Sequence, residues 1–437
     1  MSDYGIVLVL LALCAYYSWA TYGVQQVSGR PAGVQLAQQL VQQYGAKGRI
    51  LIVSRPTQED AEFADALDEG LRAGGVGTVQ QVKGQPVDAR EALERAAAAG
   101  GLDAVAATEA VAAWPVFEDL GKKFPPLAAT KVVAPKSYRF PAFLKTENLL
   151  NVANQIAVIA ILAVGMTLVI ITGGIDLSVG SLIALSAVVS TLIIRNYAGA
   201  EHAPALGMVG GSVAAILLCG VAGLVTGGMV TWFRIPSFIV TLGMMLVASG
   251  FAFLLAQGQS IYQVPDSFVW LGRGADLFRL PNAVLLTGLL YLGAHVMMGR
   301  TTLGRSIYAV GSNAEAARLS GVPIWRVQLF VYAVSGLMAG LGGVVTASQL
   351  KSGSPTYGQM YELYVIAAAV VGGTSLQGGE GRVLGTLIGA FIIAVIQNGM
   401  NLTGVESYTQ KVVLGLVILG AVLLDTFKKR GWKFGGH

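Results

Sequence analysis

The fold is decided by residues Ala160–Ile194, which read AILAVGMTLVIITGGIDLSVGSLIALSAVVSTLII. Two apolar segments flank the interruption TGGIDLSVG at 172–180, which contains one carboxylate, two hydroxyls and three glycines. An acid at membrane depth is costly, and non-helical backbone is tolerated there only inside protein or beside a water-filled cavity. We therefore predict a broken pair of membrane helices, a feature that often lies on a transport pathway. The alternative is a cytoplasmic loop between two ordinary spans.

This interruption supplies the first set of candidate residues, which would line or gate a pathway: Gly173, Gly174, Asp176, Ser178 and Gly180. Two roles are open for Asp176. One is an ion or proton site in a secondary transporter, because acids inside membranes often serve that purpose. The topology derived below places the interruption towards the cytoplasmic half. It favours a structural or gating residue that caps the next helix and faces the pathway.

The composition separates a soluble part of the chain from a membrane part. The chain has 437 residues, of which 54% are hydrophobic and 12% are charged, whereas soluble domains carry about 25% charged residues. Of the 53 charged residues, 27 lie within the 125 residues from Thr21 to Lys145. We therefore expect one soluble and one membrane domain. The net charge of +5 is not gathered into one basic tract, so no nucleic-acid partner is expected.

The soluble part, 21–145, is predicted to be an inserted extracytoplasmic α/β lobe with a linker, following a first, retained transmembrane helix at 1–20. Helical and strand patterns alternate in it, beginning with a helix at Val34–Tyr44 and a buried strand at Arg49–Arg55. Its last helix is expected at Thr108–Leu120. Such alternation is typical of a parallel, doubly wound sheet.

The membrane part, 146–427, contains nine further apolar segments, which with the first helix give a multi-pass α-helical protein of about ten spans in the lipid bilayer. An even number puts both termini on one side. Basic residues gather in alternate connections, so the positive-inside rule places both termini, with the tail 428–437, on the cytoplasmic side of the inner (plasma) membrane. The nine segments are Leu150–Ile171, Val179–Ile194, Gly207–Val230, Phe238–Leu255, Ala283–Met298, Val327–Thr346, Leu363–Val371, Val383–Ile396 and Val412–Leu424.

One connection between these spans contains a predicted short amphipathic helix at Ala314–Ser320. Asn313 is well placed to cap its start and Gly321 to end it. Glu315 and Arg318 are three residues apart and face the same way. Such a helix on the cytoplasmic side suits docking into a groove of a partner, whereas the alternative is an ordinary loop. The candidate residues of this element are Asn313, Glu315, Ala316, Arg318 and Gly321.

A third informative stretch is VGGTSLQGGEGRV at 371–383. Its glycines imitate a phosphate-binding loop, but no Gly-Lys-Ser/Thr follows and no strand leads into it, which excludes nucleotide binding. We predict a tight hinge turn between two short spans, built on the glycines that tolerate unusual backbone angles. These are Gly372, Gly373, Gly378 and Gly379.

No catalytic or metal-binding set is visible in the sequence. The three histidines, His202, His295 and His437, are scattered, and no His/Cys/carboxylate cluster has metal-ligand spacing. The two cysteines, Cys14 and Cys219, both lie in apolar runs. We therefore expect no cofactor, no metal and no covalent catalysis on this chain.

Four motifs occur in order between about Glu147 and Lys429: GMTLVIITGGIDLSVGSLIAL, WFRIPSFIVTLG, GRSIYAVGSNAEAARLSGVPI and AAAVVGGTSLQGGEGRVLGTLIGAFII. Together they resemble the membrane permeases of bacterial ABC importers of the ribose, xylose and galactose type. The resemblance implies translocation of a monosaccharide or related polyol. It implies three partners: a cytoplasmic ABC ATPase that hydrolyses ATP, an extracytoplasmic sugar-binding protein and a second permease copy. It also assigns ATPase docking to Asn313–Gly321 and carries the family's Ile-Asp-Leu-Ser-Val-Gly motif to Ile175–Gly180.

The segment Thr21–Ala134 departs from that family and is similar instead to one lobe of the periplasmic sugar-binding proteins. An Asn-Asp pair of those proteins corresponds to Thr108-Glu109 here, and Glu59–Gly70 lacks the usual Arg. One lobe also lacks the second half needed to close over a ligand. We therefore expect it to dock the binding protein or to regulate transport. The rival functions are an ion-coupled secondary transporter that uses Asp176 and a membrane-anchored receptor.

Overall fold

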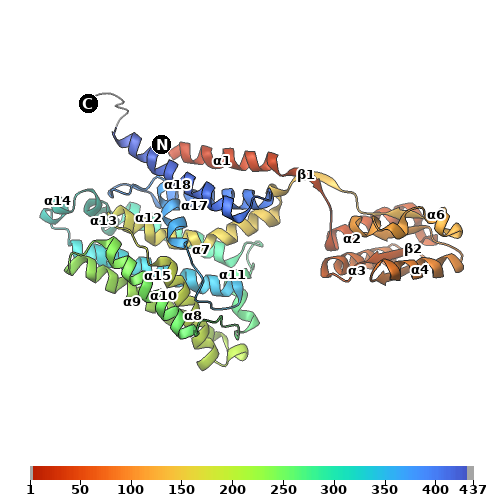
Figure 1. The fold of residues 1–437 in the computed structure, drawn as a ribbon, viewed down its shortest axis with the longest axis horizontal. Helices are drawn as coiled ribbons and strands as arrows, with labels where there is room; N and C mark the ends of the chain where they lie inside the picture. Colours follow the sequence, from red (N-terminus) through yellow and green to blue (C-terminus); the bar gives the residue numbers. More distant parts are fainter. Residues whose placement is uncertain (1–2, 431–437) are drawn as a thin grey trace. The chain divides into compact units, whose positions relative to one another are not determined.

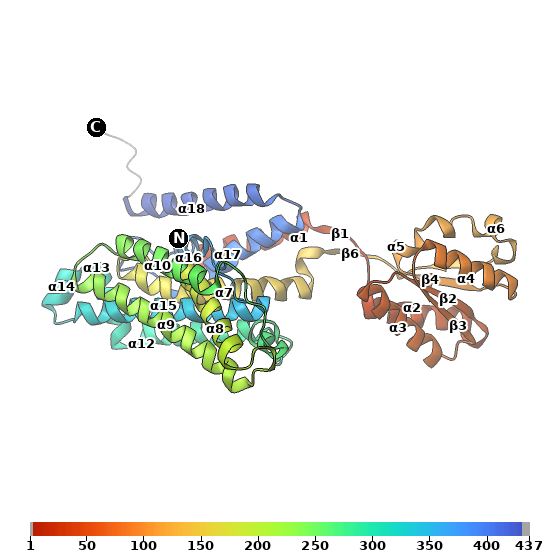
Figure 2. The same cartoon turned by 60° about the horizontal axis from the view of Figure 1, so that its bottom comes forward.

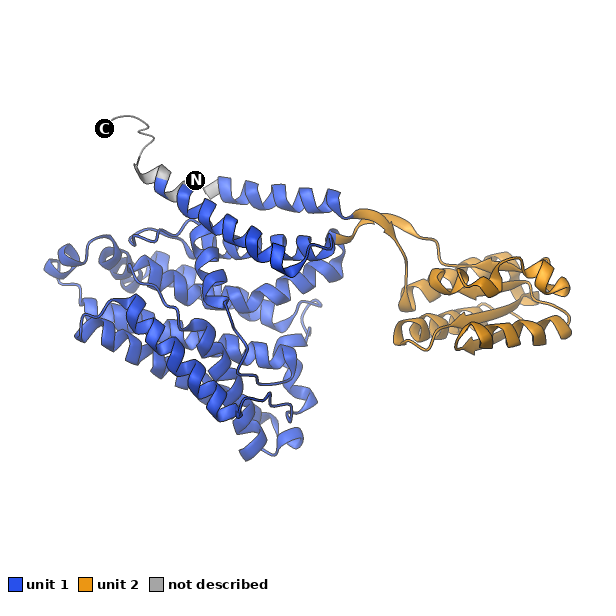
Figure 3. Ribbon diagram, in the orientation of Figure 1, with its two compact units in different colours: residues 1–21, 143–437 blue, residues 22–142 orange. Residues whose placement is uncertain are grey.

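The computed structural model describes residues 3–430, except for the side chains of 3, 4, 424, 425 and 427–430. Of the predicted tail 428–437, the last seven residues therefore lie outside the described part. The chain forms two compact units, drawn in different colours in Figure 3: Met1–Thr21 with Phe143–His437, and Tyr22–Ala142. We call them the helical unit and the α/β unit. The sequence places the end of the lobe and linker at Lys145, whereas the compact unit ends at Ala142.

The α/β unit is built on a four-stranded sheet whose strands pair in parallel in the order β3-β2-β4-β5. The strands are β2 (Arg49–Ser54), β3 (Thr78–Lys83), β4 (Ala104–Ala107) and β5 (Lys131–Val133), and the main helices are α2 (Gly29–Tyr44), α3 (Gln58–Ala73) and α4 (Pro86–Ala98). Alternate residues of a strand point to opposite faces. Ile50 and Ile52 accordingly pack with α2 and α3, whereas Leu51 and Val53 pack with α4. Figure 2 shows α2 and α3 on one side of the strands and α4 on the other. The sheet therefore has helices on both faces.

The predicted helix at Thr108–Leu120 is wrong. The chain instead forms α5 (Glu109–Ala112), a 3₁₀ turn at Pro115–Phe117 and α6 (Leu120–Lys123). Proline cannot donate the backbone hydrogen bond that a continuing helix needs, and Asp119 then takes a left-handed φ of 52°. The sequence prediction also missed an antiparallel ribbon, in which β1 (Tyr22–Gln25) pairs with β6 (Tyr138–Pro141).

The helical unit contains seven helices in the described part of the chain that are long and apolar enough to cross a membrane. All ten predicted segments are helical, and most helices extend beyond the predicted bounds. The seven are α7 (Thr146–Ile171), α8 (Val179–Tyr197), α9 (Ala205–Trp232), α10 (Ser237–Ala256), α12 (Asn282–Arg300), α15 (Ile324–Leu350) and α17 (Val383–Leu402). Three helices have shorter apolar segments: α1 (Asp3–Ala20), α16 (Tyr361–Val371) and α18 (Ser407–Arg430).

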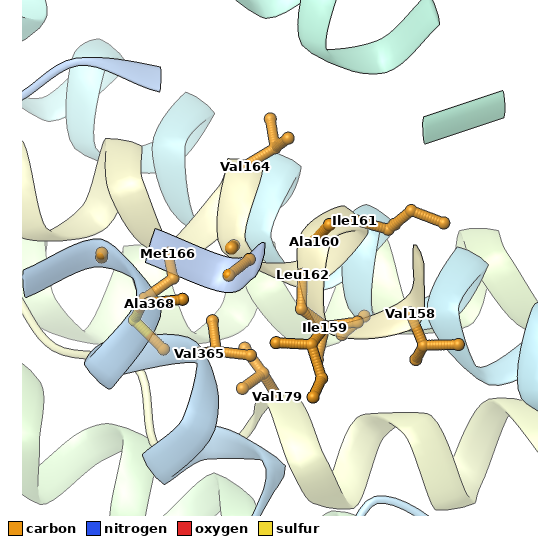
Figure 4. Close-up of a cluster of buried hydrophobic side chains, with 14 of the residues drawn as sticks. Val158, Ile159, Ala160, Ile161, Leu162, Val164, Met166, Val179, Val365 and Ala368 are labelled. Carbon is orange, nitrogen blue, oxygen red and sulfur yellow. The ribbon is translucent and has the colours of Figure 1, made fainter. Parts of the chain in front are cut away.

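Helix α7 lies at the centre of the helical unit (Figure 1). Every residue from Ile156 to Ile171 is buried, and a helix that is apolar and buried on all sides belongs in the middle of a bundle. Figure 4 shows part of this core, where Ile159 and Met166 of α7 lie near Val365 and Ala368 of α16. The broken helix pair is therefore anchored at one end by the most deeply buried helix of the unit.

Glycines allow α9 and α15 to approach closely. A Cβ added to Gly223 would lie 2.2 Å from the Tyr332 carbonyl oxygen, and one added to Gly336 would lie 2.2 Å from that of Cys219. Small residues at helix contacts are typical of membrane bundles, where close backbone packing replaces the hydrophobic driving force. Helices α9 and α15 therefore form a closely packed pair beside the interruption between α7 and α8.

Candidate functional site

The interruption begins where α7 ends in a glycine cap. Gly173 takes a φ of 80°. Its N–H donates to the Ile170 carbonyl at 2.9 Å, and the N–H of Gly174 donates to the Val169 carbonyl at 3.0 Å. This is the Schellman arrangement, which satisfies the last carbonyls of a helix and turns the chain back. The predicted break between two helices is thus present, with α8 resuming at Val179.

Asp176 is the buried centre of the interruption, with 1% of its surface exposed. Its Oδ1 accepts hydrogen bonds from the N–H and the Oγ of Ser178, at 2.9 and 2.6 Å. Its Oδ2 accepts from the Oγ of Ser335 on α15, at 2.7 Å. All three donors are uncharged. The carboxylate therefore stabilises the start of α8 through Ser178 and links it to α15 through Ser335.

The depth of Asp176 follows from its partner on α15. A Cβ added to Gly165 of α7 would lie 2.7 Å from the Ser335 Cα, so Ser335 is level with Gly165. Gly165 precedes the end of α7 by six residues, which is roughly 9 Å along a helix. The segment between α7 and α8 therefore runs back alongside α7 before α8 begins. Packing against Ser335 buries the carboxylate of Asp176 within the single chain, and the expectation that Asp176 faces a pathway stays a prediction.

The predicted short helix on the connection after α12 is present as α14 (Ala314–Leu319). The Oδ1 of Asn313 accepts a hydrogen bond from the Ala316 N–H at 2.9 Å, which is the predicted cap. Gly321 follows the helix with a φ of 84°. Arg318 donates two hydrogen bonds to Glu315, at 3.0 and 2.5 Å, and both side chains are exposed.

This exposed ion pair gives α14 a defined charged face. The hydrogen bonds from the Arg318 guanidinium hold the pKa of the Glu315 carboxyl below its usual range, so the pair stays ionised at neutral pH. Exposed pairs contribute little to stability. A partner can therefore bind these two charges, and separate them, with little loss of folding stability.

The sequence prediction missed the helix that precedes α14. Helix α13 (Thr302–Ser312) is capped by Thr301, whose Oγ1 accepts a hydrogen bond from the Gly304 N–H at 3.1 Å. The signal was a threonine cap followed by Ile307 and Val310, which form the buried face of α13. Only Asn313 separates α13 from α14, so the two helices form one continuous connection after α12.

The glycine-rich turn at 371–383 packs against the end of α7, where the interruption begins, and against the end of α13. Gly373, Gly378 and Gly379 have φ values of 89°, 84° and 75°. The Gly379 N–H donates to the Ile171 carbonyl at 2.8 Å. Gly372 packs against α17, where its added Cβ would lie 2.4 Å from the Gly385 carbonyl oxygen. The predicted turn is therefore a closely packed element.

Three segments meet at what we call the glycine junction, formed by Ile171, Gly173, Gly311, Gly378 and Gly379. A Cβ added to Gly311 at the end of α13 would lie only 1.7 Å from the Ile171 carbonyl oxygen. One added to Gly378 would lie 2.9 Å from the Gly311 carbonyl oxygen and 3.0 Å from the Gly173 nitrogen. The segment that carries α14 thus contacts the end of α7 and the start of the interruption directly.

Gly180 forms a second close contact at the start of α8. An added Cβ there would lie 2.4 Å from the Gly358 carbonyl oxygen and 2.3 Å from the Glu362 Oε2. Four of the five candidate residues of the interruption, Gly174, Asp176, Ser178 and Gly180, are therefore buried in the helical unit, whereas Gly173 is exposed.

Comparison with known proteins identifies the family. Residues 148–422 match the family described as "Branched-chain amino acid transport system / permease component". The chain belongs to this permease family. The match covers the permease from α7 into α18 and leaves the α/β unit outside it.

Curated relatives of the permease carry more specific names. It is 44% identical over 308 residues to the ribose import permease protein RbsC of Escherichia coli (strain K12), covering 69% of the permease and 93% of RbsC. It is 42% identical over 291 residues to RbsC of Bacillus subtilis (strain 168), covering 66% and 87%. It is 36% identical over 294 residues to the L-arabinose ABC transporter permease protein AraH of Azospirillum brasilense, covering 67% and 84%. No solved structure matches.

Proposed function

We propose that the permease is the membrane subunit of an ABC importer that carries a monosaccharide or related polyol across the inner membrane. The observation that supports this most strongly is the 44% identity that extends over 93% of a ribose import permease. A cytoplasmic ABC ATPase hydrolyses ATP, an extracytoplasmic binding protein delivers the sugar, and a second copy of the permease completes the pathway. The chain itself performs no covalent chemistry.

The proposed topology has ten spans, with both termini in the cytoplasm and the α/β unit outside. Basic residues in the connections support this orientation, among them Arg300 at the end of α12, Arg305 in α13 and Arg318 in α14. Helix α16 has 11 residues, or roughly 16 Å, about half the hydrocarbon thickness. The non-helical segment 351–360 lies along α8 before α16 begins and would complete this span. Such backbone is tolerated at depth only when protein surrounds it.

ATP hydrolysis would act on the pathway through α14. The proposed route runs from an ATPase bound at Asn313–Gly321 into α13, and from Gly311 into the Ile171 carbonyl and the interruption. Support comes from the direct contact at the glycine junction, because a closely packed backbone contact transmits a displacement instead of absorbing it.

The α/β unit would serve as a docking platform for the binding protein or as a regulator of transport. In the proposed topology it lies on the side where a binding protein lands. Arg55 at the end of β2 donates hydrogen bonds to the buried Asp60 at 2.7 and 3.2 Å. The Arg55 guanidinium is therefore already hydrogen-bonded within the α/β unit. This is consistent with a unit that docks the binding protein and does not itself close over a sugar.

An uptake panel tests the proposed function. Cells with and without the permease gene are given radiolabelled D-ribose, L-arabinose, D-allose or L-leucine. We expect permease-dependent uptake of at least one sugar and none of leucine. Permease-dependent uptake of leucine alone would overturn the proposal and favour the amino acid named in the family description.

A further inference from the structure

A hollow of about 170 Å³ lies in the helical unit between α7, α16 and α17. Its lining combines amide, aromatic and aliphatic side chains: Gln155, Ile156, Ile159, Tyr361, Tyr364, Ala394 and Gln397. Gln155 lies nine residues inside α7, roughly 14 Å from its start. The hollow is therefore within the membrane-spanning part of the unit, beside the core drawn in Figure 4, where Ile159 is labelled.

The two glutamine amides in this hollow lack hydrogen-bond partners in the described part of the chain. Three other amides on α7 and α17, those of Asn148, Asn154 and Asn398, have hydrogen-bond partners. Asn148 of α7 and Asn398 of α17 exchange hydrogen bonds at 3.0 and 2.9 Å, and Gln349 donates to the Asn154 carbonyl at 2.9 Å. Asn151 of α7 also has no partner among the described residues, but only Gln155 and Gln397 line the hollow, where their amides are available to a ligand.

An unpaired amide cannot face hydrocarbon without a large desolvation cost. Gln155 is exposed and Gln397 is half-buried in the single chain. Polar side chains in membrane segments almost always face the bundle interior or a water-filled cavity. The hollow is thus a place for water or for a polar ligand, and not for a lipid chain.

The chemistry of the lining selects the class of ligand. None of the seven residues that line the hollow is charged, so a zwitterion such as an amino acid would lose hydration without gaining an ionic partner. Each amide both donates and accepts, as a sugar hydroxyl does. The half-buried rings of Tyr361 and Tyr364, with centroids 6.3 Å apart and planes at 62°, offer apolar faces and hydroxyls. The volume corresponds to that of about six molecules of liquid water.

We propose that Gln155, Gln397, Tyr361 and Tyr364 form a contact site for a neutral polyhydroxylated substrate during translocation. This inference rests on the proposed function as a sugar importer. It adds the residues that touch the sugar inside the membrane. It also explains why the pathway would accept sugars and reject the amino acids that the family description names.

Substitution of the amides tests the site in the assembled transporter. Gln155→Leu and Gln397→Leu keep the size of the side chain and remove its hydrogen bonds. We expect the maximal rate of sugar uptake to fall about threefold to tenfold for each, the range for loss of one uncharged hydrogen bond. The sugar concentration that gives half-maximal uptake should stay unchanged, because the binding protein captures the sugar first.

Two readouts separate sugar contact from a folding defect. ATP hydrolysis stimulated by the sugar-loaded binding protein should stay near the wild-type rate in both variants, so that fewer sugars enter per ATP. Gln328→Leu, the same change on α15 away from the hollow, should leave both rates unchanged. Equal losses of uptake and of stimulated hydrolysis would overturn the contact site, as would wild-type uptake in the double variant. If the wild-type permease carries no sugar, the proposed function itself fails, and this outcome is seen before any variant is made.

Discussion

Asp176 offers a sharp test of the interruption, because its buried carboxylate accepts three hydrogen bonds. We predict that Asp176→Asn retains most transport and that Asp176→Ala does not. An asparagine carbonyl can accept both bonds from Ser178, and its amide can donate to the Oγ of Ser335, because a hydroxyl both donates and accepts. The isosteric change therefore keeps all three contacts and removes only the charge.

The expected cost of Asp176→Ala follows from the number of bonds lost. Hydrogen bonds inside membrane proteins contribute about 0.6 kcal/mol on average and up to about 1.7 kcal/mol. A charged acceptor favours the upper end of that range, so three bonds amount to roughly 3–5 kcal/mol. Ser335→Ala removes one bond and should cost roughly 1–2 kcal/mol, but less than about 0.5 kcal/mol when Asp176 is already alanine.

Reversible unfolding by SDS in mixed micelles measures these free energies, and sugar uptake normalised to membrane-inserted protein measures function. Additive effects of Asp176→Ala and Ser335→Ala would refute the contact between α15 and the interruption. Loss of uptake in a well-folded Asp176→Asn variant would show that the charge is essential, which is the result that an ion-coupled transporter requires.

Three further predictions concern coupling and the α/β unit. Exchanging the charges of α14 in Glu315→Lys/Arg318→Glu should abolish ATP-driven uptake with normal membrane insertion, as measured by uptake and immunoblotting; full uptake would exclude docking at α14. Gly311→Ala should lower uptake severalfold and destabilise the unit by about 1–3 kcal/mol, because its Cβ would overlap the Ile171 carbonyl oxygen; the control Gly299→Ala, whose Cβ meets nothing within 4 Å, should be neutral. Replacing residues 26–137 by Asn-Gly should close β1 and β6 into a hairpin and weaken binding-protein affinity in a pull-down; unchanged affinity would exclude docking.

Much of the helical unit is predictable from the sequence, because long apolar runs in a chain of low charge have few other stable forms. The break after Ile171 was visible because a glycine such as Gly173 can take the left-handed conformation that ends a helix. The helix at Ala314–Leu319 was visible because Asn313 and Gly321 are local start and stop signals. Each of these features depends on neighbours in the sequence.

The depth of the interruption could not be predicted in the same way. Asp176 is placed by Ser335, which lies 159 residues further along the chain. The sequence pattern suggested a capping residue that faces a pathway, whereas tertiary packing buries the carboxylate against α15. The glycine junction could not be predicted for the same reason, because Gly311, Ile171 and Gly379 come together only in the folded chain.

The secondary-structure prediction also failed where two local sequence signals conflicted. The segment 108–120 has apolar residues at helical spacing, but Pro115 removes a backbone donor and ends the helix. The ribbon of β1 and β6 joins strands separated by more than a hundred residues, so no short-range pattern marks it. The two amides of the hollow look like isolated polar residues until α7 and α17 are placed side by side.

The source of energy tests the central claim most directly. Sugar uptake is measured in glucose-fed cells that lack ATP synthase, treated either with a protonophore, which collapses the ion gradient, or with arsenate, which depletes ATP. An ABC importer predicts that permease-dependent uptake survives the protonophore and is abolished by arsenate. Uptake that stops with the protonophore and continues with arsenate would contradict the account and support an ion-coupled transporter.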